Sequence, residues 1–185
     1  MKARTLVILA GCGALCACAS PQIAANAPSA DLAGVDVAAV VAGNGADYVM
    51  KAGASDLFEI ESSRIALTRA RDADVRAYAQ MMIDHHTRTS AQVMEAARAD
   101  GLNPPAPILP ADKMRKLDAL RTVSAETFDQ AYVREQLTGH TEALVLHQNF
   151  AEEGRVEALK RVAGAAVPIV RSHLDRAHVL ARDVG

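Results

Sequence analysis

The segment VRAYAQMMIDHHTRTSAQV, residues 75–93, decides the fold class of this chain. Its apolar and histidine positions recur every three or four residues, at Val75, Tyr78, Met82, His85, Thr89 and Val93. This spacing places the six side chains on one face of an α-helix. Asp72 precedes the segment as a helix N-cap, and Gly101 follows it as a residue that ends helices. The segment therefore predicts one long amphipathic helix.

The same period continues on both sides of this segment, in further helices at about 45–71, 111–122, 125–153 and 155–183. Gly164 and Pro168 interrupt the last of these, so we expect a kink or a break there. The proline-rich stretch 103–110 forces an extended crossing in the centre of the chain. Tight turns and one long central connection together predict an all-α fold, a four-helix ferritin-like bundle whose last helix is broken.

Composition agrees with a helical protein. Alanine, the best helix former, occupies 38 of the 185 positions, whereas aromatic residues make up 3% and tryptophan is absent. The net charge of −2 comes from 20 basic and 22 acidic residues. Nucleic-acid binding requires a basic face that neutralises phosphates, so we expect no nucleic-acid partner.

The N-terminus is typical of an exported protein. Lys2 and Arg4 precede a short apolar stretch, and residues 1–19 also contain all three cysteines. Leu15-Cys16-Ala17-Cys18 resembles a lipobox, so we expect lipidation at Cys18, with Cys12 as the alternative. Cleavage after Ala19 would instead release a soluble protein. We expect a periplasmic protein anchored to the outer membrane, with a flexible tether over 20–43 and the bundle domain over 44–185.

Polar residues within the apolar stripes are the candidate metal ligands. The main candidates are Glu61, His85, His140 and His173, and the further candidates are His147 and Met82. An unpaired carboxylate in a core is unfavourable, so Glu61 needs a partner there. Glu61 and His85 lie at similar distances from the turn near residue 72, which predicts that they are neighbours in adjacent helices.

The other histidines fit one site less well. Counted from the turn near residue 154, His140 and His173 differ in height by roughly 7–8 Å, and His147 lies about 10 Å from His140 along its helix. His86 and His178 lie beside the stripes, so we expect both to be partly exposed. A hydrogen-bonded cluster without an ion would satisfy the same sequence.

Imidazole with carboxylate suits zinc, iron, copper or nickel, and a thioether from Met82 would favour copper. The Glu-x-x-His pairs of di-iron carboxylate proteins do not occur in the sequence. We therefore expect a cell-envelope binding protein with a divalent or copper ion in its core. The alternatives are a metal-dependent oxidase with an atypical ligand set, and a structural or stress-related envelope protein without a ligand.

Four ordered stretches resemble the family called domain of unknown function 4142 (DUF4142), a group of exported bacterial proteins. They are Glu59-Ile60-Glu61 with Ala66, the run from Ala79 to His85, Phe128-Asp129 with Tyr132 and His140, and Pro168 with His173-Leu174. The resemblance implies a ferritin-like fold and gives no reaction. It places Glu61, His85, His140 and His173 at motif positions. The chain departs from the family pattern at His86, where threonine is more usual, and at Ala125, where glycine often stands.

Overall fold

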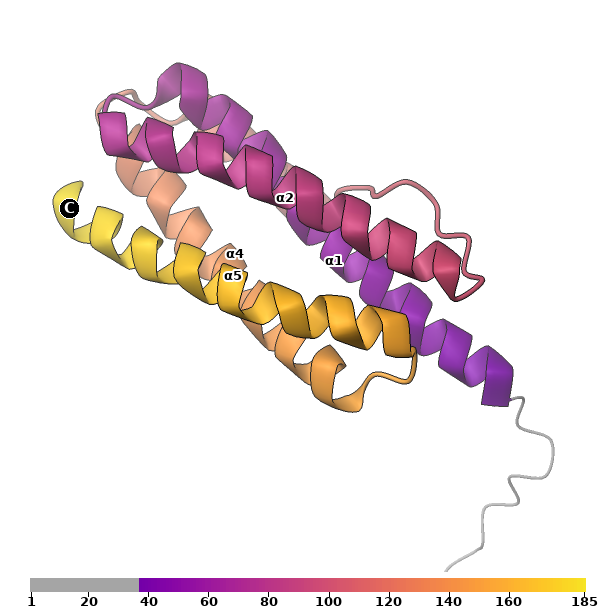
Figure 1. Ribbon diagram of the computed structural model, residues 1–185. Coiled ribbons are helices and arrows are strands. Elements are labelled where there is room, and N and C mark those ends of the chain that lie inside the picture. Colours follow the sequence, from indigo (N-terminus) through magenta and orange to yellow (C-terminus); the bar gives the residue numbers. More distant parts are fainter. Residues whose placement is uncertain (1–36) are drawn as a thin grey trace, which may run out of the picture. The chain divides into compact units, whose positions relative to one another are not determined.

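The computed structural model describes residues 37–185, with side chains from residue 44, and contains five α-helices there (Figure 1). The helices are α1 (Val37–Arg69), α2 (Ala73–Ala99), α3 (Ala111–Thr122), α4 (Phe128–Glu153) and α5 (Glu157–Asp183). Residues 37–185 contain no strand, so the all-α prediction is confirmed. The expected export signal, Cys12 and Cys18 lie outside the described residues. Helix α1 begins at Val37, which is inside the stretch 20–43 expected as a tether.

The predicted boundaries of α2 are confirmed by its caps. The Asp72 carboxylate accepts hydrogen bonds from the backbone N–H groups of Asp74 and Val75, which satisfies two otherwise unpaired donors. Gly101 follows the C-cap with a φ of 77°, a left-handed conformation that glycine adopts without strain. Helix α4 begins at Phe128 instead of about 125, because Thr127 and not Ser124 is its N-cap residue.

The helices pack as two hairpins. Short turns join α1 to α2 and α4 to α5, while α1 also packs on α4 and α2 on α5 (Figure 1). Helix α3 packs on α1 and α4, at the end of the long connection from α2. The Arg69 guanidinium anchors the end of this connection by donating hydrogen bonds to the backbone carbonyls of Leu120 and Val123. None of the helices within 37–185 combines the length and hydropathy needed to cross a membrane.

Two apolar clusters form the core. One lies near the α1–α2 turn and includes Ala66, Val75, Tyr78, Met82, Phe128, Tyr132, Ala177 and Leu180. The other lies toward the opposite ends of the same helices and includes Tyr48, Val49, Val93, Ala97, Phe150, Leu159 and Ala163. On each long helix, a stretch of several residues separates the two clusters, and this middle stretch carries the buried histidines and carboxylates.

The prediction of a broken last helix is wrong. Helix α5 continues from Glu157 to Asp183 with Pro168 inside it. The proline ring crowds the carbonyl four residues earlier, which here belongs to Gly164, a residue whose backbone adjusts easily. Ala163, Ala166 and Val170 are buried on both sides of the proline, so packing holds the helix together across the lost hydrogen bond.

Candidate metal centre

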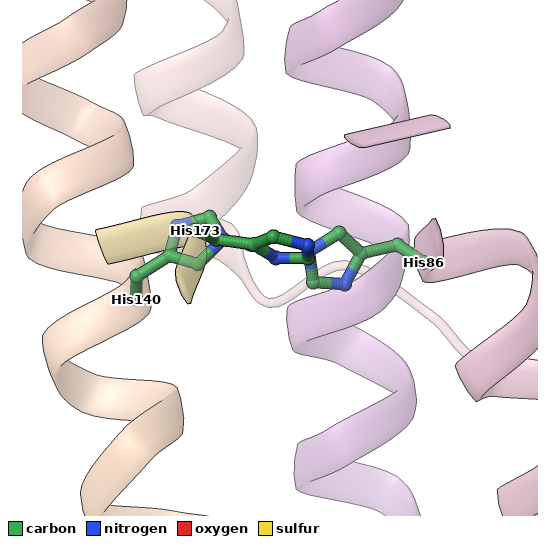
Figure 2. Close-up of side chains that lie close together, drawn as sticks. All are labelled: His86, His140 and His173. Atoms are coloured by element: carbon green, nitrogen blue, oxygen red, sulfur yellow. The ribbon is translucent and has the colours of Figure 1, made fainter. Parts of the chain in front are cut away.

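Three buried histidines from three helices meet in the middle of the bundle. They are His86 of α2, His140 of α4 and His173 of α5, and their side chains converge in Figure 2. Their exposed fractions are 4%, 0% and 2%. One ligand nitrogen from each ring lies within 4.8 Å of the others. The ring centroids form a nearly equilateral triangle with sides of 5.5, 5.3 and 5.3 Å. The three rings therefore lie close enough together to hold a metal ion.

Each ring is held by a partner outside this group. Nδ1 of His86 lies 2.8 Å from a carboxylate oxygen of Asp56, and Nδ1 of His140 lies 2.8 Å from the backbone carbonyl oxygen of Gln136. Nε2 of His173 lies 2.8 Å from Nδ1 of His85. Metal-binding histidines commonly bond a carboxylate or carbonyl through the second ring nitrogen, which fixes the ring orientation. His86 and His140 follow this pattern, whereas the partner of His173 is the imidazole of His85.

These partners determine the tautomers of two rings. A carbonyl and a carboxylate only accept hydrogen bonds, so Nδ1 of both His140 and His86 carries the proton. In the neutral rings, Nε2 of His140 and Nε2 of His86 then keep free lone pairs. Nε2 of His140 lies 3.3 Å from Nδ1 of His173, which donates to it in the absence of an ion. Nε2 of His86 is buried and has no hydrogen-bond partner in the described part of the chain.

Burial and neighbouring charges separate the pKa values of the three rings. Burial, together with the positive charge of His86, lowers the pKa of His140 to about 3. The same causes, with His140 and His85 adding to them, lower the pKa of His173 to about 2. Burial also opposes protonation of His86, but the carboxylates of Asp56 and Glu59 outweigh it and raise its pKa. His140 and His173 are therefore neutral at physiological pH, the form that binds metal.

A second buried carboxylate lies beside the trio. Glu59 is 1% exposed, and neither of its carboxylate oxygens has a hydrogen-bond partner among residues 37–185. Burial raises its pKa to about 7, against the lowering effects of His86, Gln136 and Lys113. A Cβ added at Gly139 would lie 2.5 Å from Oε1 of Glu59, so the carboxylate fills the space that glycine leaves open.

The structure brings some of the predicted ligands together and leaves others apart. His140 and His173 are in the trio. His85 is half-buried at its edge, where it contacts His173 and no other member through a hydrogen bond. The predicted offset of 7–8 Å between His140 and His173 is wrong. His140 lies 13 residues before the end of α4, and His173 lies 16 residues after the start of α5. The difference of three residues corresponds to a height difference of about 4.5 Å along the helices, which the two side chains span.

Glu61 and His85 share no hydrogen bond in the described part of the chain. Its side chain is 31% exposed and pairs with Arg64 at 2.6 Å on the bundle surface. The buried face of α1 instead runs through Ala52, Asp56, Glu59, Ser62, Ser63 and Ala66. Phe58 is buried as well, but the middle of this face is polar at Asp56 and Glu59, and a search for apolar positions does not select those two residues. The spacing of Asp56 and Glu59 between Ala52 and Ala66 is the pattern that could have identified them.

The expectation that His86 is partly exposed is wrong, since the residue is 4% exposed. Met82 is followed by His85 after three residues and by His86 after four, and both spacings continue a helical stripe. The buried face of α2 contains Met82 and His86, and His85 lies at the edge of this face. His178 is exposed, as predicted.

The two further candidates lie elsewhere in the core. Met82 is fully buried in the apolar cluster near the α1–α2 turn. Nδ1 of His147 lies 3.0 Å from the hydroxyl of Tyr48, whose ring stacks on Phe150 in the opposite cluster. Neither residue belongs to the trio.

The spacing within the trio fits a zinc ion. Nitrogen ligands on one zinc ion lie about 3.3 Å apart, and this is the distance between Nε2 of His140 and Nδ1 of His173.

Comparison with known proteins adds a family and a fold. The model of the family described as "Domain of unknown function (DUF4142)" matches residues 24–180. Among solved structures, the crystal structure of a DUF305 fragment from Deinococcus radiodurans is similar, with a TM-score of 0.65 and 18% sequence identity. The alignment covers 75% of this chain and 96% of that chain, and it concerns the fold alone. No match is found among the curated proteins.

Proposed function

The chain belongs to the DUF4142 family of domains of unknown function, and we propose that it binds one divalent metal ion through His86, His140 and His173. One observation carries this proposal. Each of the three buried rings is held from outside by a hydrogen-bond partner, and one ligand nitrogen of each lies within 4.8 Å of the others. A cluster that served packing alone would not need Nε2 of His86 to stay unpaired in the core.

The donor set supports an ion of borderline character. Three neutral imidazoles suit zinc, iron, nickel and copper, and three protein ligands leave a fourth position for another group. Thioether coordination of copper has less support, because Met82 is a member of the apolar cluster near the α1–α2 turn. The near-complete burial of the trio favours binding of the ion over turnover of a substrate.

The proposal also extends to the architecture and the location. Two packed hairpins and the similarity to the DUF305 fragment support a ferritin-like bundle of α1, α2, α4 and α5, with α3 in the crossing connection. The basic start, the apolar stretch and the cysteines at 12, 16 and 18 support export and lipidation at Cys18, or else at Cys12. The protein would then hold its ion in the periplasm, at the outer membrane.

Thermal melting of residues 37–185 tests the metal proposal. A ligand that binds only the folded state raises the melting temperature, and the stabilisation grows with the logarithm of its concentration divided by its Kd. Zinc should therefore raise the melting temperature of the wild type at pH 7.5, and His86→Ala should abolish that rise. His178→Ala, which alters an exposed histidine, is the control and should keep it. If zinc, copper and iron all leave the wild-type melting temperature unchanged, the histidines form a packing cluster without an ion.

A further inference from the structure

Four buried acceptor atoms without partners belong to the histidine trio or to residues near it on α1 and α4. They are both carboxylate oxygens of Glu59, the side-chain oxygen of Gln136 and Nε2 of His86, none of which has a hydrogen-bond partner within residues 37–185. Gln136 is fully buried and directs its amide nitrogen to Ser62 at 3.3 Å. Unpaired acceptors in a core are strongly unfavourable. A cation bound by the Glu59 carboxylate and by Nε2 of His86 would give these atoms the partner that they lack, whereas a hydrophobic contact would not.

Several contacts bring these atoms to one place. Oε1 of Glu59 lies against Gly139, the residue before His140, and Gln136 lies one turn before His140 on the same helix. On α1, Asp56 lies one turn before Glu59 and holds the ring of His86. Helix α1 packs on α2 and α4, the helices of His86 and His140, and crosses behind the sticks in Figure 2. Glu59 is thus on the α1 side of the trio, although it is not one of the three residues whose ligand atoms lie within 4.8 Å of one another.

The charges near the trio favour an ion of charge +2. Asp56 and Glu59 are the buried carboxylates there, with exposed fractions of 4% and 1%. Lys113 does not neutralise either of them by contact, because its ammonium lies 4.9 Å from the Phe58 ring centroid and 3.8 Å from Glu142. As metal ligands the three imidazoles are neutral and add no charge. A divalent ion balances two carboxylates, whereas a monovalent ion leaves one negative charge buried.

We infer that Glu59 is an anionic oxygen ligand that completes the trio and makes the centre take a divalent ion in preference to monovalent copper. This inference rests on the proposed metal site. The carboxylate of Glu59 reaches its place beside the residue before His140 because position 139 is a glycine, where a Cβ would lie 2.5 Å from Oε1.

Two ions and two glutamine variants test the role of Glu59. The dissociation constants for Zn²⁺ and Cu⁺ are measured by competition with chromophoric chelators, in anaerobic buffer at pH 7.5. Glu59→Gln keeps the size of the side chain and removes its charge, so zinc affinity should fall about 10- to 100-fold. Affinity for Cu⁺ should stay within about threefold of wild type. Glu59→Gln removes an anionic ligand from this ion, but it also removes the negative charge that a monovalent ion leaves unbalanced, and the two effects oppose each other. Glu61→Gln, two residues away and on the surface, is the matched control and should change neither constant.

The possible outcomes separate this inference from the site itself. If the wild type and Glu59→Gln bind zinc equally, Glu59 is not a ligand, while the histidine site stands. If Glu59→Gln lowers the affinity for both ions equally, Glu59 organises the core but does not favour a divalent ion over a monovalent one. This result also overturns the inference. If the wild type binds neither ion, the proposed function fails.

A second variant keeps the test usable if Glu59→Gln does not fold. Glu59→Asp retains the charge and withdraws the carboxylate by one methylene, in a smaller side chain that the buried site can hold. Its zinc affinity should fall below that of the wild type, while folding is checked by circular dichroism. Wild-type zinc affinity in a folded Glu59→Asp protein would contradict coordination by Glu59.

Discussion

The metal-free protein should lose stability as the pH falls below about 6.5, and two buried histidines should cause most of the loss. The pKa of His140 is lowered to about 3 and that of His173 to about 2, from an ordinary value of 6.5. Between these values the unfolded chain binds protons that the folded chain does not. Each histidine then lowers the free energy of unfolding by about 1.4 kcal/mol for every pH unit of acidification.

Glu59 opposes this loss over part of the range. Its pKa is raised from 4.5 to about 7, so the folded chain binds the extra proton between these values and gains about 1.4 kcal/mol for each pH unit of acidification. For His140, His173 and Glu59 together, the expected loss is about 1.4 kcal/mol per pH unit between pH 6.5 and 4.5, and about 2.8 kcal/mol per unit below pH 4.5. Burial also lowers the pKa of His147, which acts in the same direction. A small domain with 5–15 kcal/mol of stability should therefore unfold in moderate acid.

Urea unfolding followed by circular dichroism, with EDTA present, measures this slope between pH 7 and 3.5. His140→Gln removes one of the two titrating groups and should reduce the slope below pH 4.5 by about half. A free energy of unfolding that is constant, or that rises as the pH falls from 6.5 to 4, would refute the assignment of two neutral buried histidines. The same result would follow if the trio were open to solvent.

Three further predictions concern the helices and the anchor. Asp72→Ala removes two capping hydrogen bonds and should cost about 0.5–2 kcal/mol in urea unfolding, whereas an unchanged midpoint would mean that the cap is not formed. Phe58→Ala, at a fully buried ring, should cost about 3–5 kcal/mol, and Leu144→Ala should cost less because Leu144 is half-buried; a reversed order would contradict the packing. Cys18→Ser should move the full-length protein from the membrane fraction to the soluble periplasmic fraction, while release by Cys12→Ser alone would identify the other cysteine.

The helices were predictable because their ends depend on local chemistry. Asp72 and Gly101 act through their own side chain or backbone, so the boundaries of α2 follow from the sequence alone. The continuity of α5 could not be predicted in the same way. Pro168 destabilises the helix locally, because it removes a backbone hydrogen bond. The packing of Ala166 and Val170 against the neighbouring helices offsets this loss, and the local sequence does not show that packing.

The site was harder to predict than the fold. Two of the three clustered histidines, His140 and His173, were selected because they lie in apolar stripes. The choice between His85 and His86 depends on a rotation of 100° around α2, which spacings of three and four residues do not resolve. On α1 the face toward the core is polar, so a search for apolar stripes selected Glu61 and missed Glu59.

X-ray absorption at the zinc edge tests the metal site most directly. Purified residues 37–185 are loaded with one equivalent of Zn²⁺ at pH 7.5 and freed of unbound metal. We predict that the ion is retained and that its scattering fits about three imidazole nitrogens at about 2.0–2.1 Å. The His173→Ala variant should lose one imidazole from this count or fail to retain the ion. Loss of the zinc on desalting of the wild type, or a spectrum without imidazole ligands, would contradict the histidine site.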